Sequence, residues 1–252
     1  MILYKYLAVK NADNWLIGEN SILLTPPKYL NDLLEFRIRR EPADLDERRE
    51  MFEKFQRESP SNLTFEEYDS SVTSKEHMDS EAEEMRELLS GVMGVVSLTS
   101  DPVNELMWAH YGSNSGVAVG YRSEEVAKRN GMRFSFLPIG VAIEVEYSND
   151  VVSMKKDFSD APHHLTTKRE CWIYECEWRI VQNLPEARPV KRDGKTYYAL
   201  PAEREQIAHV VFGVNAEAAF IDRVRGWLRD GPARLQKVII NHDSHELELS
   251  DI

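Results

Sequence analysis

The stretch WIYECEWRIV, residues 172–181, contains two carboxylates and a guanidinium that are spaced two residues apart. They belong to Glu175, Glu177 and Arg179, and their spacing of two predicts a β-strand that carries all three on one face. The opposite face would turn five residues toward a core: Trp172, Tyr174, Cys176, Trp178 and Ile180. Such a strand either displays a salt-bridged surface or lines a polar cleft in which chemistry takes place.

A second group that could do chemistry lies in the segment LMWAHY, residues 106–111, which predicts a short helix beside a Gly/Ser/Asn turn. His110 and Tyr111 would stand at the end of this helix. A histidine there can act as a base, donate a hydrogen bond to a ligand, or simply place a positive charge at the end of the helix dipole. If this helix and the strand at residues 172–181 meet, we expect Glu175, Glu177, His110 and Tyr111 to surround one pocket.

Several familiar site patterns are missing from the sequence. It contains no G-x-S-x-G, P-loop, G-x-G-x-x-G or H-E-x-x-H motif, which argues against the corresponding hydrolases, nucleoside triphosphatases, dehydrogenases and zinc proteases. The seven histidines do not cluster, and the pair His163 and His164 lacks ligand spacing, so we expect no metal.

The two cysteines, Cys171 and Cys176, are five residues apart. Five strand residues span roughly 16 Å, whereas a disulfide needs Cα atoms within about 7 Å. We therefore expect both thiols to be reduced and Cys176 to be buried.

Charge is distributed unevenly along the 252 residues, whose formal net charge is −12. Residues 41–90 contain sixteen acidic and six basic side chains, so this segment accounts for an excess of ten negative charges. The acidic balance argues against an unspecific grip on nucleic acid, although the nearly neutral remainder leaves room for a local basic groove. Helical spacing of Met and Phe residues in this segment predicts an acidic helical insertion covering one side of the sheet.

The rest of the chain alternates between strand and helix patterns. Residues 2–9 predict a first strand, residues 123–129 a short helix, residues 190–198 a hairpin turning at Asp-Gly, and residues 216–229 an amphipathic helix. These patterns predict one α+β domain over residues 1–252, with a mixed, largely antiparallel sheet and the acidic insertion at 41–90.

No apolar run reaches the roughly 20 residues that span a bilayer, and the first residues, MILYKY, do not resemble a secretion signal. We therefore expect a cytoplasmic protein without a membrane partner.

Five motifs follow one another along the chain: YKY, T-P-P-x-x-x-N-D-x-x-E, SLT, LMWAHYGSNSGVAVGY and K-x-x-x-W-x-Y-E-x-E-W-R. Together they resemble a widespread bacterial family of unknown function that is marked by N-D-P-F-E and M-W-x-H-Y signatures. The resemblance covers essentially the whole chain and places thirteen residues at signature positions: Tyr4, Asn31, Asp32, Glu35, Trp108, His110, Tyr111, Gly116, Lys168, Trp172, Glu175, Glu177 and Arg179. Leu33 replaces the proline of the family pattern, so the turn there is looser or is replaced by a helix cap.

The aromatic first strand, the short strand with Thr25 and the late E-x-E strand are also similar to ADP-ribosyltransferase-like folds. That resemblance implies that Glu177 handles the nicotinamide-side ribose of NAD as a substrate, that Glu175 orients or deprotonates an acceptor, and that Tyr111 or Tyr4 stacks on nicotinamide. Six residues are expected to bind the cofactor: Tyr4, Lys5, Tyr6, Thr25, Trp108 and Arg179. The sequence departs from that pattern at Lys5 and its neighbouring tyrosines, where those enzymes carry His or Arg.

Three functional hypotheses follow. The first is an ADP-ribosyltransferase or NAD glycohydrolase of a bacterial defence or toxin-like system, which would bind a nucleotide or dinucleotide and use a protein or nucleic-acid acceptor. The second is a non-catalytic ligand-binding or sensor module of an anti-phage system, and the third is another enzyme class such as a nuclease.

Overall fold

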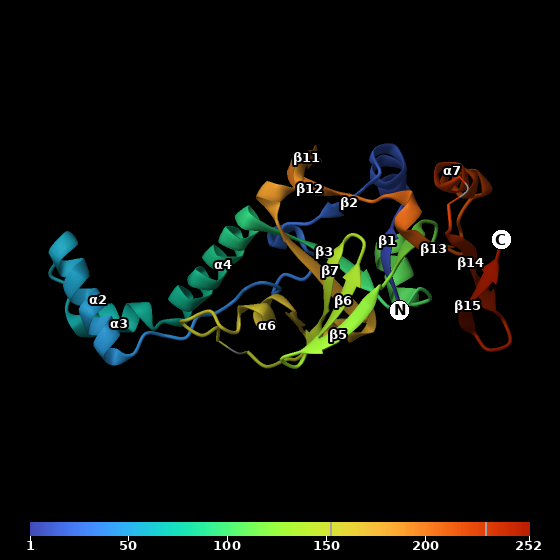
Figure 1. Cartoon of the computed structure of the whole chain (residues 1–252). Coiled ribbons are helices and arrows are strands. Elements are labelled where there is room, and N and C mark those ends of the chain that lie inside the picture. Colours follow the sequence, from blue (N-terminus) through green and yellow to red (C-terminus); the bar gives the residue numbers. More distant parts are fainter. Residues whose placement is uncertain (152, 230) are drawn as a thin grey trace. The chain divides into compact units, whose positions relative to one another are not determined.

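The computed structural model describes residues 1–151, 153–229 and 231–252. The chain forms two compact units. The first comprises Met1–Pro26, Val92–Asn149 and Thr166–Ile252, and the second comprises Pro27–Gly91 and Asp150–Leu165. Figure 1 shows the elements of both units along the chain.

A ten-stranded sheet forms the centre of the first unit. Its strands, in order across the sheet, are β15 (Glu246–Asp251), β14 (Arg234–Asn241), β13 (Ile207–Phe212), β4 (Val117–Arg122), β1 (Ile2–Leu7), β3 (Met93–Thr99), β10 (Glu177–Asn183), β7 (Gly140–Glu144), β6 (Met132–Leu137) and β5 (Glu125–Arg129). Neighbouring strands are antiparallel except for the parallel pair β13 and β14. This mixed, largely antiparallel sheet confirms the predicted α+β class.

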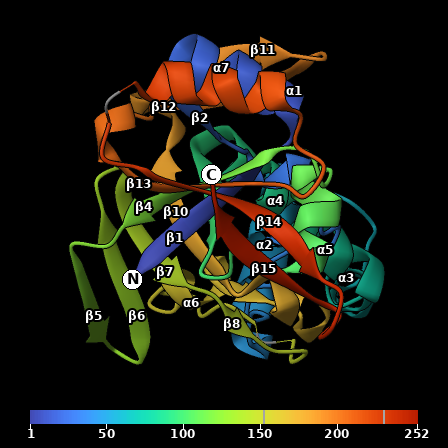
Figure 2. The ribbon, with the colours of Figure 1, turned by 90° about the vertical axis from the view of Figure 1, so that its right-hand side faces the viewer.

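One face of this sheet is covered by α7 (Ala218–Leu228), by the π-helical turn η1 (Ala12–Ile17) that follows α1 (Val9–Asn11), and by a small sheet (Figure 2). The small sheet has the order β11 (Arg188–Arg192), β12 (Lys195–Pro201) and β2 (Ser21–Leu24). Asp193 and Gly194 both have positive φ in the turn between β11 and β12, which confirms the predicted Asp-Gly hairpin. The larger hydrophobic core lies between these layers.

The other face of the sheet carries a smaller, more aromatic core around Tyr4, Tyr6 and Trp108. It is covered by α5 (Glu105–Met107) and the π-helical turn η3 (Trp108–Gly112). The remaining elements of this unit are the strand pair β8 (Glu146–Tyr147) and β9 (Thr167–Lys168), and the 3-10 helices η4 (Glu170–Glu175), η5 (Leu184–Glu186) and η6 (Arg204–Gln206).

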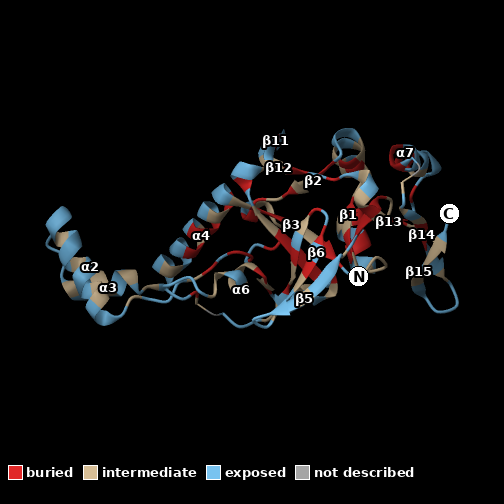
Figure 3. Cartoon of the chain, in the orientation of Figure 1, coloured by how far each residue is buried: buried red, intermediate tan, exposed pale blue. Residues whose placement is uncertain are grey.

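The second unit is mainly helical. It contains η2 (Pro27–Tyr29), α2 (Leu45–Glu58), α3 (Phe65–Val72), most of α4 (Lys75–Val92) and α6 (Ala161–Leu165). Asp44 and Thr64 begin α2 and α3 with capping boxes, and neither helix buries a residue (Figure 3). The acidic segment at residues 41–90 is thus helical, as predicted, and its Met85 packs in a small core with Ile38 and Met154.

Three predictions from local patterns are wrong. Residues 172–175 belong to η4 instead of a strand, and β10 begins only at Glu177. Residues 125–129 form the edge strand β5, because they pair with β6, in place of the predicted helix. Cys176 is exposed, although both cysteines are free as expected.

Within the part of the chain that the structure describes, no helix combines the length and the apolar composition needed to cross a membrane.

Candidate functional site

The candidate site lies where η4 ends and β10 begins. Cys176, between them, has φ 44° and ψ 48°, in the left-handed region, so the chain turns sharply between the two glutamates. Asn104 supports this turn by donating a side-chain hydrogen bond of 2.9 Å to the carbonyl of Tyr174. As a result Glu175 and Glu177 come from different elements and still reach the same buried ammonium group.

That ammonium group belongs to Lys168 of β9. Its Nζ donates to Glu175 Oε2 at 2.5 Å and to Glu177 Oε2 at 2.9 Å, and the three side chains are 2 to 4% exposed. Burial by itself lowers the pKa of Lys168, but the charges and hydrogen bonds of Glu177 and Glu175 outweigh it, and the net effect raises the pKa above its ordinary value. Lys168 therefore stays a fixed positive charge between two carboxylates.

Arg179 and Tyr147 complete the surroundings of Glu177. Arg179 Nε donates to Glu177 Oε1 at 3.0 Å and its Nη2 donates to Oε2 at 3.1 Å, while the Glu177 backbone N–H donates to the Tyr147 hydroxyl at 2.8 Å. Burial raises the pKa of Glu177, and the nearby charge of Glu175 acts in the same direction, whereas Lys168 opposes the shift. Both carboxylate oxygens of Glu177 are thus occupied by cationic donors.

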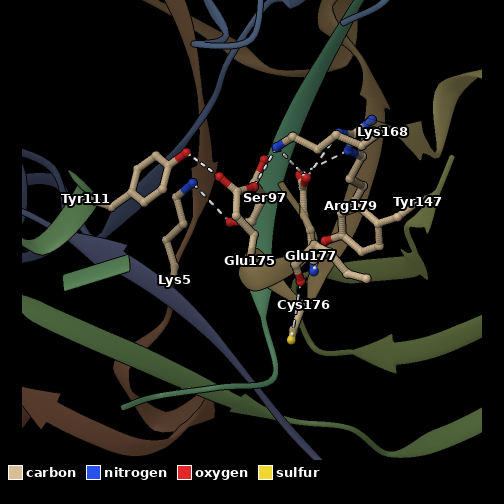
Figure 4. Close-up of polar contacts among 10 residues, drawn as sticks. Lys5, Ser97, Tyr111, Tyr147, Lys168, Glu175, Cys176, Glu177 and Arg179 are labelled. Carbon is tan, nitrogen blue, oxygen red and sulfur yellow. Dashed lines mark hydrogen bonds and ion pairs between the residues drawn. The ribbon is translucent and has the colours of Figure 1, made fainter. Parts of the chain in front are cut away.

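Glu175 has a different partner on its second oxygen. The hydroxyl of Tyr111, in η3, donates to Glu175 Oε1 at 2.6 Å. Figure 4 shows Tyr111 and Lys5 approaching on one side of Glu175, and Lys168 and Arg179 on the side of Glu177. Tyr111 is only half-buried, so Glu175 has a partner side chain that solvent can reach.

Lys5 of β1 is the third cation of the site. It is half-buried, and its Nζ donates to the backbone carbonyl of Ser97 at 3.1 Å. Burial lowers the pKa of Lys5 to about 8; Glu177 and Glu175 act against this shift, and the charge of Lys168 adds to it. We call Lys5, Tyr111, Lys168, Glu175, Glu177 and Arg179 the carboxylate cluster.

A row of aromatic rings leads up to this cluster. The ring centroids of Trp172 and Tyr174 are 6.0 Å apart, those of Tyr174 and His110 6.5 Å, and those of His110 and Tyr111 6.4 Å. His110 is exposed and the other three rings are half-buried. We call these four residues the aromatic row. It joins the cluster through the Tyr111 hydroxyl and also through Trp172, because Lys168 Nζ lies 5.0 Å from the centroid of the Trp172 ring.

Of the four residues predicted to carry out catalysis, Glu175, Glu177 and Tyr111 converge in the cluster, and His110 stands beside it in the aromatic row. Of the six predicted to bind a cofactor, Lys5 and Arg179 belong to the cluster. Their chemical roles stay predictions.

The other four residues of that prediction lie outside the cluster. Tyr6 and Trp108 are buried with ring centroids 4.7 Å apart, and both donate to backbone carbonyls of the loop after β3. Tyr4 is also buried, and its hydroxyl lies 2.8 Å from Nδ1 of His209. Thr25 pairs through its backbone with Val95, at the other end of β3 from the cluster.

Sequence reasoning gave no chemical role to Lys168, Ser97 or Tyr147. Lys168 had a signal, because it stands at a signature position seven residues before Glu175. Ser97 and Tyr147 lacked one, since their positions beside the glutamates depend on strand pairing. Among the described residues, no group of three or more His, Cys, Asp or Glu side chains is arranged to hold a metal ion.

Residues 107–180 match the family model of DUF2971, a protein family of unknown function. Over these residues the match confirms the predicted resemblance to an uncharacterised family, which was expected to extend over essentially the whole chain. The DUF2971 segment contains every residue of the carboxylate cluster except Lys5, and it includes the whole aromatic row. No curated protein and no solved structure matches the chain. The description of DUF2971 names no activity, so the similarity to ADP-ribosyltransferase-like folds stays a hypothesis.

Proposed function

We propose that the chain cleaves the bond between nicotinamide and ribose in NAD, or in a closely related nucleotide, and passes ADP-ribose to water or to another acceptor. The observation that supports this most is the aromatic row, which leads to Glu175 through the Tyr111 hydroxyl. A ligand with a flat ring and a developing positive charge would match the site, because the ring could stack on the aromatic row and the charge could lie near the Glu175 carboxylate.

The aromatic row suits the ring of a nucleotide. Every nucleobase has a π-face, and stacking on an aromatic side chain contributes about 1–3 kcal/mol per base. Tyr174 and Trp172 are half-buried, so their rings are held by the protein and still reachable. A nicotinamide or adenine ring stacked on this row would place its ribose toward Tyr111 and Glu175.

Glu175 is the carboxylate that we assign to the ribose, in place of Glu177, to which the resemblance to ADP-ribosyltransferase-like folds gave this role. Glu177 is held on both oxygens by Arg179 and on one of them also by Lys168. Glu175 Oε1 instead meets the neutral hydroxyl of Tyr111, which a ribose hydroxyl could replace. Glu177 then serves as a positioning residue that fixes Lys168.

The reaction asks little of the protein beyond electrostatics. The electron pair of the C1′–N bond leaves with the pyridinium nitrogen, which becomes neutral, and C1′ with the ring oxygen becomes oxocarbenium-like in the transition state. The Glu175 carboxylate would hydrogen-bond a ribose hydroxyl and stabilise this positive charge. The oxygen of an acceptor bonds to C1′ as nicotinamide leaves, and it loses its proton.

The test measures NAD binding by calorimetry and nicotinamide release for the wild-type protein, Glu175→Gln and the matched control Glu170→Gln. Glu170 is an exposed glutamate of the same 3-10 helix. We expect Glu175→Gln to bind NAD and to lose about 10²-fold or more in the rate of release, because the amide lacks the negative charge. Glu170→Gln should keep the wild-type rate. Absence of both NAD binding and nicotinamide release in the wild-type protein would contradict the proposal.

A second candidate function is a non-catalytic ligand-binding or sensor module. Three cationic side chains, Lys5, Lys168 and Arg179, surround two carboxylates, so the carboxylates are already neutralised before any ligand arrives. Such a site could hold a nucleotide without cleaving it. NAD binding with no nicotinamide release, in the presence of protein and nucleic-acid acceptors, would favour this function.

A further inference from the structure

The carboxylate cluster contains one more cation than it has carboxylates. Lys168 donates to both glutamates, and Arg179 donates twice to Glu177. Tyr111 takes the remaining oxygen of Glu175. Lys5 points into the same cluster, but its hydrogen bond goes to the backbone carbonyl of Ser97 (Figure 4). The surplus positive charge therefore resides on Lys5.

The half-buried ammonium group of Lys5 can remove this surplus positive charge by losing a proton. The groups that face Lys5 are the carbonyl of Ser97, the ammonium of Lys168 and the carboxylates of Glu175 and Glu177. A neutral amine keeps its hydrogen bond to the Ser97 carbonyl, because it still has two N–H donors, and it gains a free lone pair.

We propose that Lys5 is the base that takes the proton of the acceptor as the acceptor attacks the ribose, and that the acceptor is a hydroxyl group, either water or an alcohol. This inference rests on the proposed function. As the C1′–N electron pair leaves with nicotinamide, a lone pair of the hydroxyl oxygen forms the new C1′–O bond. The O–H proton moves to Nζ of neutral Lys5, which becomes an ammonium ion and later releases the proton to solvent.

The pKa values of Lys168 and Lys5 are shifted in opposite directions, which supports a structural role for Lys168 and a role as a base for Lys5. The pKa of Lys168 is raised above its ordinary value, whereas burial lowers the pKa of Lys5 to about 8. Environments that separate the pKa values of two like groups are typical of acid and base assignments in enzymes. Lys168 holds the glutamates in place, and Lys5 can exchange a proton near neutral pH.

The first measurement titrates Lys5 directly. The intact protein is labelled with a trace of acetic anhydride at a series of pH values, and mass spectrometry quantifies acetylation of Lys5 against a free lysine derivative, whose pKa is about 10.4. We expect half-maximal reactivity of Lys5 near pH 8. A midpoint equal to that of the reference amine, or no labelling at any pH, would overturn the assignment, since a base must be both neutral and reachable.

Two variants connect this titration to the site. Glu175→Gln removes a negative charge that favours the ammonium form, so the midpoint of Lys5 should move to lower pH while that of the exposed Lys128 stays in place. Lys5→Met should lower nicotinamide release about 10²-fold and remove the rise of the rate between about pH 7 and 9. Release at the wild-type rate and with the same pH profile in Lys5→Met would overturn the role of Lys5. A wild-type protein that releases no nicotinamide would instead overturn the proposed function, and the labelling midpoint would still report on Lys5.

Discussion

Arg179 binds Glu177, two residues before it on β10, through two hydrogen bonds: Nε donates to Oε1 at 3.0 Å and Nη2 donates to Oε2 at 3.1 Å. The side chains are 1% and 2% exposed. A buried pair of this kind costs free energy to desolvate, so its net contribution to stability is small, but losing one partner leaves an uncompensated charge in the interior. We infer that Arg179 is needed for folding whether or not the site is catalytic.

Arg179→Met should therefore lower the free energy of unfolding by about 3 kcal/mol or more, because Glu177 stays buried and loses both hydrogen bonds from the guanidinium. The measurement is urea unfolding followed by tryptophan fluorescence. The control is Arg234→Met, which removes an ion pair with Asp251 whose side chains are 63% and 70% exposed and which should cost at most about 1 kcal/mol. Equal costs for the two variants would contradict the prediction.

Gly120 leaves room for the ring of Tyr4 to cross β4 toward His209. A Cβ at Gly120 would lie 2.7 Å from Cε1 of Tyr4 and 2.6 Å from Cγ2 of Ile2. Gly120→Ala should therefore displace these side chains and destabilise the protein by about 1–3 kcal/mol.

The matched control for this variant is Gly226→Ala, in the exposed part of α7, where a Cβ meets no atom within 4 Å. Alanine suits a helix better than glycine, so this change should stabilise the protein by about 0.5–1 kcal/mol. Thermal unfolding of both variants distinguishes the two cases, and an unchanged melting temperature for Gly120→Ala would show that the Tyr4 ring can move without cost.

His209 should make stability depend on pH. Burial lowers its pKa below the ordinary value of 6.5, and the charge of Arg234 acts in the same direction. Below pH 6.5 the unfolded chain binds a proton at this histidine more readily than the folded protein does. The free energy of unfolding therefore falls as the pH drops from 6.5 through the pKa of His209 in the folded protein. Above pH 6.5 the contribution of His209 to stability is fully present.

The measurement compares urea unfolding at about pH 7.5 and pH 5 for the wild-type protein and His209→Gln. Other groups titrate equally in both, so their common pH dependence cancels in the comparison. The wild-type protein should lose more stability than the variant on acidification. Parallel losses would mean that His209 is protonated as easily in the folded protein as in the unfolded chain.

Local patterns in the sequence were enough for the fold class and for several elements. Alternation predicted β1, the Asp-Gly turn predicted the β11–β12 hairpin, and the apolar stripe of residues 216–229 predicted α7. Each of these signals lies within a few neighbouring residues, because strand alternation, turn geometry and helix periodicity are local properties. The glutamates, Tyr111 and Lys5 could likewise be named from the sequence.

Only the tertiary structure decided which elements these residues belong to and which partners they bind. The alternation in residues 172–175 is that of a strand, yet these residues form η4, because the turn at Cys176 and the buried ammonium of Lys168 hold Glu175 inside. Residues 125–129 became strand β5 through pairing with β6. The sequence also could not show that Arg179 occupies Glu177 while Glu175 faces Tyr111, or that Lys5 has no carboxylate left to bind, since hydrogen bonds between distant segments depend on register and burial.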